Sequence, residues 1–188
     1  MTASALSSPP QLCMMRPTLE KLGAVAVPAG YAIRTSREGD CAHWSRIISE
    51  AFASADFDEA FFEREMRGDP VYRPERIFFV CDAEGRPCGT ASAYRRGQYG
   101  SDAGYLHYVG VTRAHAGRGL GEAVSLAVLH RFKDEGLTRA ALQTDDFRLP
   151  AIRTYLKLGF EPMFTHESHP ERWRNIVQQL EERKAAGG

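Results

Sequence analysis

A glycine-rich turn near the middle of the chain has the composition of an anion-binding site. Gly117, Gly119 and Gly121 lie between an apolar run and a stretch with helical periodicity. Glycines allow the backbone to expose successive N–H groups, and the first N–H groups of a helix have no partner within the helix. Arg113 and Arg118 add positive charge to this turn, which contains no acidic residue. The sequence therefore predicts a phosphate or pyrophosphate site, and the alternative is a tight turn that binds nothing.

Two common nucleotide-binding motifs do not match this turn. A Walker loop has the pattern GxxxxGK[ST], and neither Lys-Ser nor Lys-Thr follows these glycines. A Rossmann fingerprint follows the first strand of its βαβ unit, whereas three or four strands are expected before this turn. A nucleotide-binding module of another kind is left open.

Metal and disulfide chemistry is not expected from the remaining reactive side chains. The four cysteines have no CxxC spacing: Cys13, Cys41, Cys81 and Cys88. His166 and His169 have HxxH spacing, but they flank a strand end and the start of a helix. We expect no metal site, and the free thiols indicate a reducing, cytoplasmic compartment.

The overall composition narrows the class of protein. The chain has 188 residues, with 24 Lys and Arg against 24 Asp and Glu, and 43% of its residues are hydrophobic. A nucleic-acid-binding protein would need a basic surplus or stripe to contact phosphates. No apolar run approaches the roughly 20 residues that a membrane span requires. We therefore expect one hydrophobic core and no nucleic-acid or membrane partner.

Residues 1–28 are expected to be a poorly ordered leader, and residues 29–188 to form the domain. Prolines punctuate the first segment, beginning with the run Ser7-Ser8-Pro9-Pro10. Met14 and Met15 leave open where translation begins.

Regular patterns beyond residue 29 predict an α/β fold with one mixed, mostly antiparallel sheet and helices on both faces. Strands are expected at residues 31–35, 76–81, 88–95, 104–111, 139–144 and 160–165. Helices are expected after the capping residue Asp40, at 58–67, from 120 to Gly136, at 150–158 and at 169–184. The short turns between the second, third and fourth strands favour an antiparallel meander.

Two motifs give the sequence a family resemblance. The segment from Val111 to Gly121 resembles the acyl-CoA-binding loop of the GNAT N-acetyltransferases, and the segment from Ala151 to Phe160 (AxxxYxxxGF) resembles their helix–strand signature. The spacing between the motifs also agrees, and the resemblance covers about residues 31–184. Two positions depart from the pattern: Ala116 stands where the family usually has Gln or Arg, and Arg148 where it usually has Asn.

The resemblance implies an acyl-CoA N-acyltransferase fold in which two neighbouring strands splay apart to admit acetyl-CoA as co-substrate. The pantetheine arm would pair with the strand before the loop, and the N–H group of Val109 would polarise the thioester carbonyl. The residues expected to bind acetyl-CoA are Tyr108, Val109, Gly110, Val111, Arg113, Ala116, Gly117, Arg118, Gly119, Leu120 and Gly121.

The same resemblance assigns two catalytic residues. Tyr155 stands where the family places the acid that protonates the departing thiolate; the alternative is a core tyrosine. His107 lies close to where relatives often carry a glutamate and is the candidate base, whereas Tyr108 would point to the other face of the strand. The alternative is that His107 has a structural role and that ordered water is the base.

The implied reaction is acetyl transfer to a primary amine of a small molecule or protein, and a non-catalytic acyl-CoA-binding or sensing module is the alternative. The stretch from Glu50 to Asp69 contains seven acidic residues and two basic ones. This excess of negative charge could attract a cationic acceptor, and the alternative is a solvated helix face. The stretch from Thr144 to Phe160 is also similar to mycothiol synthase relatives. The closing amphipathic helix and the edge strands are compatible with a homodimer.

Overall fold

Seven strands form one sheet in the computed structural model, which describes residues 9–186. The strands are β1 (Leu12–Arg16), β2 (Ala32–Thr35), β3 (Ile77–Cys81), β4 (Pro87–Tyr94), β5 (Ala103–Val111), β6 (Arg139–Thr144) and β7 (Glu161–Met163). Their order in the sheet is β2-β3-β4-β5-β6-β1-β7. Among these seven strands of residues 9–186, only β5 and β6 pair in parallel, so the sheet is mixed and mostly antiparallel, as the sequence predicts.

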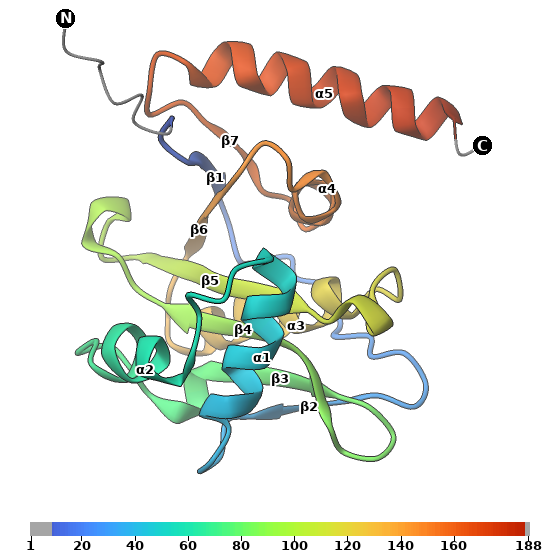
Figure 1. The fold of residues 1–188 in the computed structure, drawn as a ribbon. Coiled ribbons are helices and arrows are strands. Elements are labelled where there is room, and N and C mark those ends of the chain that lie inside the picture. Colours follow the sequence, from blue (N-terminus) through green and yellow to red (C-terminus); the bar gives the residue numbers. More distant parts are fainter. Residues whose placement is uncertain (1–8, 187–188) are drawn as a thin grey trace, which may run out of the picture.

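Helices cover both faces of this sheet (Figure 1). They are α1 (Cys41–Phe52), α2 (Glu59–Phe61), α3 (Leu120–Asp134), α4 (Leu149–Lys157) and α5 (His169–Ala186). The helix expected at 58–67 is irregular, because α2 continues as a π-helical segment, η1 (Phe62–Arg67). Short 3₁₀ turns, η2 (Pro74–Arg76), η3 (Gly97–Tyr99) and η4 (Arg113–His115), complete the connections.

Helix α1 packs on one face of the sheet through a stripe of buried side chains. Trp44, Ile47 and Ile48 recur at helical spacing and are fully buried. Gly110 of β5 lies beneath them, and a Cβ atom there would come within 3.0 Å of Ile48 and of Ala51. The glycine therefore allows α1 to lie directly against the strand that borders the site.

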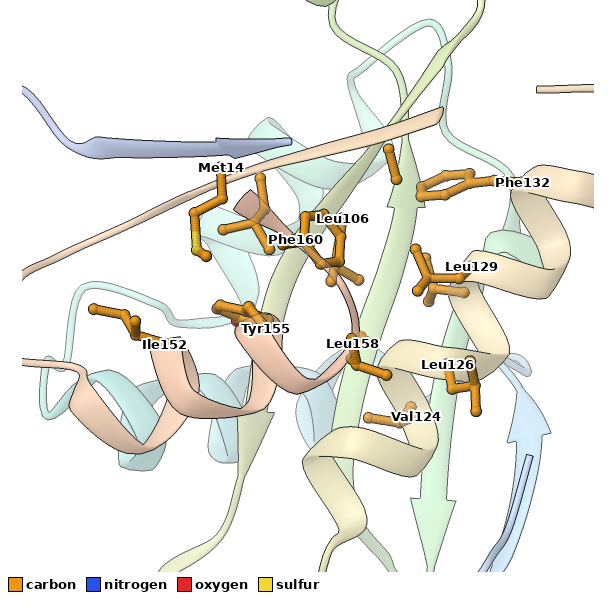
Figure 2. Close-up of a cluster of buried hydrophobic side chains, with 14 of the residues drawn as sticks. Met14, Leu106, Val124, Leu126, Leu129, Phe132, Ile152, Tyr155, Leu158 and Phe160 are labelled. Carbon is orange, nitrogen blue, oxygen red and sulfur yellow. The ribbon is translucent and has the colours of Figure 1, made fainter. Parts of the chain in front are cut away.

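Helices α3, α4 and α5 enclose the larger hydrophobic cluster on the opposite face. Figure 2 shows Leu129 and Phe132 of α3 on one side of this cluster and Tyr155 of α4 on the other, with Leu106 of β5 between them. Gly104 of β5 touches the ring of Phe132, and a Cβ atom there would overlap it.

The first described strand corrects the expectation of a poorly ordered leader over residues 1–28; positions 1–8 lie outside the described residues. β1 pairs antiparallel with β6 and with β7, and Leu12 and Met14 are fully buried. The backbone groups of β1 thus form hydrogen bonds on both sides, and its apolar side chains enter the core. These interactions stabilise the strand although prolines lie on either side of it in the sequence. A start at Met14 or Met15 would remove the first part of this strand.

Asp40 precedes α1, but it does not cap the helix with its side chain. Its carboxylate instead accepts two hydrogen bonds from Arg34 of β2, at 2.6 and 2.9 Å, and one from the N–H of Arg37 at 2.6 Å. The acidic residue therefore ties the start of α1 to the edge of the sheet.

Candidate active site

The parallel strands β5 and β6 separate after three residue pairs. Ala103, Gly104 and Tyr105 face residues 139–141, and no further pairing of the two strands follows. A cavity of about 600 Å³ lies where they diverge, bordered by β5, the glycine turn and α4. The strand splay that the resemblance implies is therefore present.

A β-bulge at Tyr108 bends β5 at the same place. Thr90 of β4 faces Gly110 while Ser92 faces His107, so Tyr108 and Val109 together lie opposite one residue of β4. Tyr108 has a φ of 45°, in the left-handed region that a tyrosine rarely adopts. Bulges bend a strand and redirect its side chains.

The bulge corrects the expected orientation of Tyr108. The rings of His107 and Tyr108 are 3.8 Å apart between centroids, so both lie on the α1 face rather than on opposite faces. Tyr108 packs edge-on against Trp44 at 5.1 Å and against Phe57 at 5.9 Å. These aromatic contacts hold the strained backbone in place, and Tyr108 does not line the cavity.

The cavity lining combines distant parts of the chain. It includes ten of the predicted site residues: Val109, Gly110, Val111, Arg113, Ala116, Gly117, Gly119, Leu120, Gly121 and Tyr155. Three predicted residues are not part of the lining: His107, Tyr108 and Arg118. Helix α1 adds Glu50, the first residue of the acidic stretch, and α5 adds Leu180 and Arg183, which were not predicted as site residues.

The glycine turn has the backbone conformation that an anion site requires. Gly117 and Gly119 have φ values of 74° and 77°, and no atom within 4 Å would obstruct a Cβ at either position. These glycines are therefore needed for the left-handed backbone and not for space. At the start of α3, the N–H of Ala123 donates a hydrogen bond to the carbonyl of Gly119 at 3.0 Å. The N–H groups before it are at the positive end of the helix dipole, beside the cavity.

Arginines from three elements line the cavity: Arg113, Arg148, Arg153 and Arg183. Arg118 is directed elsewhere, since it donates to the hydroxyl of Tyr31 at 2.7 Å and to the carbonyl of Ala114 at 3.3 Å. Glu50 contributes the opposite charge, and its Oε1 accepts a hydrogen bond from the N–H of Arg113 at 2.6 Å.

Tyr155 lies in the large hydrophobic cluster (Figure 2). It also borders the cavity. Burial raises the pKa of Tyr155 to about 12, and the positive charge of Arg148 opposes part of this rise. The tyrosine therefore keeps its proton at neutral pH, and the core role and the catalytic role proposed for it are compatible.

His107 lies in a more enclosed place, between aromatic rings. Its ring centroid is 5.3 Å from that of Tyr94 and 5.0 Å from that of Tyr105. Burial, and secondly the charge of Arg96, lowers the pKa of His107 to about 3. An imidazole with this pKa is neutral and binds a proton weakly, which is unfavourable for a base.

The contacts of two further residues that line the cavity, His115 and Arg148, were not predicted from the sequence. His115 of η4 lines the cavity, and its Nδ1 lies 2.9 Å from the hydroxyl of Thr112. Arg148 reaches from the start of α4 to β5, where its Nη2 donates to the carbonyl of Val109 at 3.4 Å. The Thr-x-x-His spacing could have indicated the contact between Thr112 and His115. Nothing in the local sequence indicates the contact between Arg148 and Val109.

Within residues 9–186, no three His, Cys, Asp or Glu side chains gather closely enough to hold a metal ion. None of the helices in the same part of the chain is both long and apolar enough to cross a membrane.

The mixed sheet, with two splayed parallel strands beside a glycine turn, is the acyl-CoA N-acyltransferase fold. A GCN5-related N-acetyltransferase from Sphaerobacter thermophilus shares it with a TM-score of 0.64 and 24% sequence identity, over 82% of this chain and 50% of that one. The sequence model of the acetyltransferase (GNAT) family matches residues 41–160, and the chain belongs to this family.

Curated relatives include proteins named mycothiol acetyltransferase. That of Thermomonospora curvata is 32% identical over 154 residues, which are 79% of this chain and 50% of the relative. That of Nocardia farcinica is 30% identical over 160 residues, 81% of this chain and 53% of the relative. The chain thus spans about half the length of the curated relatives it matches.

Proposed function

We propose that this chain transfers the acetyl group of acetyl-CoA to a primary amine. The observation that carries the proposal is the cavity, which extends from the glycine turn, along residues 109–111 of the splayed strand, to Tyr155. Its parts correspond in order to the pyrophosphate, the pantetheine arm and the thioester of one acetyl-CoA molecule.

The residues present suit the chemistry of that substrate. Backbone N–H groups at the start of α3 and the side chain of Arg113 would hold the pyrophosphate, while the unpaired edge of β5 would accept the amides of the pantetheine arm. Ala116 cannot supply the contact of the Gln or Arg usual at its position. Arg153 and Arg183, both exposed in the lining, add positive charge to the same cavity.

The reaction has three chemical requirements. The N–H group of Val109 polarises the thioester carbonyl, on which negative charge develops as the amine attacks. Tyr155 donates a hydrogen bond to the departing sulfur. The attacking ammonium group loses its proton to water, because the enclosed and weakly basic His107 is a poor acceptor.

The acidic stretch gives limited support to a cationic acceptor. Glu63 pairs with Arg67, Glu65 with Arg64 and Asp69 with Arg96, so these three charges are compensated. Asp58 accepts a hydrogen bond from the N–H of Phe61 at 2.7 Å, Glu59 contacts the thiol of Cys41, and Asp56 accepts from the hydroxyl of Ser54. Local structure therefore accounts for most of these acids. The first acceptor to test is instead the amine that mycothiol acetyltransferases acetylate.

Two measurements on the purified chain test the proposal. Calorimetric titration with CoA should show binding that Arg113→Gln weakens, and CoA release should appear when acetyl-CoA is combined with an active member of a panel of primary amines. Acetyl-CoA binding without release from any amine would support the sensing alternative. Protection by ATP or NAD with no response to CoA would refute the proposal.

A further inference from the structure

Arg148 crosses the gap between the splayed strands. It lies immediately before α4, and its Nη2 donates to the carbonyl of Val109 on β5 at 3.4 Å. Its Cζ lies 3.8 Å from the centroid of the Phe52 ring, at the end of α1. One side chain therefore connects three elements that border the thioester end of the cavity.

The charge of Arg148 is available to a ligand. No carboxylate within residues 9–186 forms an ion pair with it. A guanidinium has five N–H donors. The hydrogen bond from Arg148 to the carbonyl of Val109 uses one of them and is long, at 3.4 Å. The side chain also lines the cavity, so its remaining donors have access to a molecule bound there.

The leaving group of the proposed reaction needs such a charge. The amine nitrogen forms a bond to the carbonyl carbon, the C–S bond breaks, and its electron pair remains on sulfur. The pKa of Tyr155, about 12, is about 3.5 units above that of an ordinary thiol, so transfer of the tyrosine proton to the thiolate is unfavourable. The negative charge on sulfur must therefore be stabilised by another group.

We propose that Arg148 is a catalytic residue whose guanidinium stabilises the sulfur of CoA as a thiolate when the C–S bond breaks. This inference rests on the proposed function. The nitrogen loses its proton to water, and the thiolate is protonated afterwards by solvent. Arg148 also opposes the rise in the pKa of Tyr155, so its charge acts on the tyrosine that borders the same cavity.

The test uses CoA bound to the intact chain and needs no knowledge of the acceptor. The ultraviolet absorbance of the thiolate is followed against pH for the complex, and the spectrum of the free protein is subtracted to remove its four cysteines. A cation within about 4–6 Å lowers the pKa of an acidic group by about 1–3 units. The thiol of bound CoA should therefore titrate about 1–3 units below that of free CoA.

Arg148→Gln should abolish this shift, and Arg148→Lys should retain part of it. Arg153→Gln is the matched control, because it removes the same charge from the lining of the same cavity, at a residue that does not contact Val109 or Phe52. Thermal unfolding shows whether each variant is folded, and the shift in the wild type tests the proposal independently of any variant.

The outcomes separate the inference from the function on which it rests. A bound thiol that titrates like free CoA in the wild type, or equally in the wild type and Arg148→Gln, overturns the role of Arg148 while leaving CoA binding established. Absence of CoA binding to the wild type overturns the proposed function and the inference with it.

Discussion

Replacing Met14 by alanine should destabilise the protein markedly, because β1 is part of the sheet. Met14 is fully buried in the cluster that also contains Leu106, Tyr155 and Phe160 (Figure 2). Its strand is paired on both sides, so the surroundings cannot collapse freely into the space left behind. Truncating a buried methionine to alanine costs about 2–5 kcal/mol, and about 3 kcal/mol is expected here. In a chain of this size, that lowers Tm by roughly 6–12 °C.

Thermal unfolding followed by circular dichroism measures this effect, and urea unfolding at 25 °C checks it as a free energy. Leu156→Ala is the control, because Leu156 is 37% exposed on α4 and its truncation should cost less than about 1 kcal/mol. A Met14→Ala variant that melts with the wild type would show that residues 12–16 are not packed in the sheet, and would refute the reasoning.

Three other substitutions test the site and the core. Tyr155→Phe should lower kcat about 10²-fold, because one hydrogen bond to the departing sulfur is lost, and leave the affinity for acetyl-CoA within about twofold, as steady-state kinetics would show. The pKa of His107 is lowered to about 3 in the folded chain. As the pH falls below about 6.5, the imidazole therefore binds a proton in the unfolded chain but not in the folded chain. Between pH 6.5 and about 4.5 the wild type should therefore lose about 2 kcal/mol more stability than His107→Gln in urea titrations. Gly104→Ala would force a methyl group into the ring of Phe132 and should cost about 1–3 kcal/mol by thermal unfolding.

Contrary results would each identify a different error. Full turnover in Tyr155→Phe would remove the hydroxyl from the mechanism. Equal acid sensitivity of the wild type and His107→Gln would mean that the histidine is hydrated in the folded state. An unchanged Tm in Gly104→Ala would place Phe132 farther from β5.

The sequence predicted the elements whose patterns are local. The meander of β3, β4 and β5 was visible from apolar runs separated by short turns, and α3 from its apolar face after the glycine turn. β1 was missed because Leu12–Arg16 is short and lacks alternation, and because its partners come at the opposite end of the chain. Leu12 faces Thr144, and no local pattern carries that information.

The site was predictable where the backbone acts and less so where side chains act. The glycine turn and residues 109–111 line the cavity as expected, because glycine spacing and strand position determine where a backbone lies. No glycine marked the left-handed residue Tyr108, whose conformation follows from aromatic contacts made by α1 and its neighbours. Charge alone also failed to separate Arg118, which binds Tyr31, from Arg153, which faces the cavity.

The position of β1 has a consequence for synthesis of the protein. Leu12–Arg16 is synthesised before the other six strands, whereas β6 and β7, which hold it on both sides, are synthesised after them. At about 5–20 residues per second, the apolar side chains of β1 wait on the order of 10 s for their partners. During that interval the segment is an unpaired strand with a hydrophobic face, which is the kind of surface that chaperones and aggregating neighbours recognise. The yield of folded protein should therefore depend on what the nascent chain meets before β6 and β7 emerge.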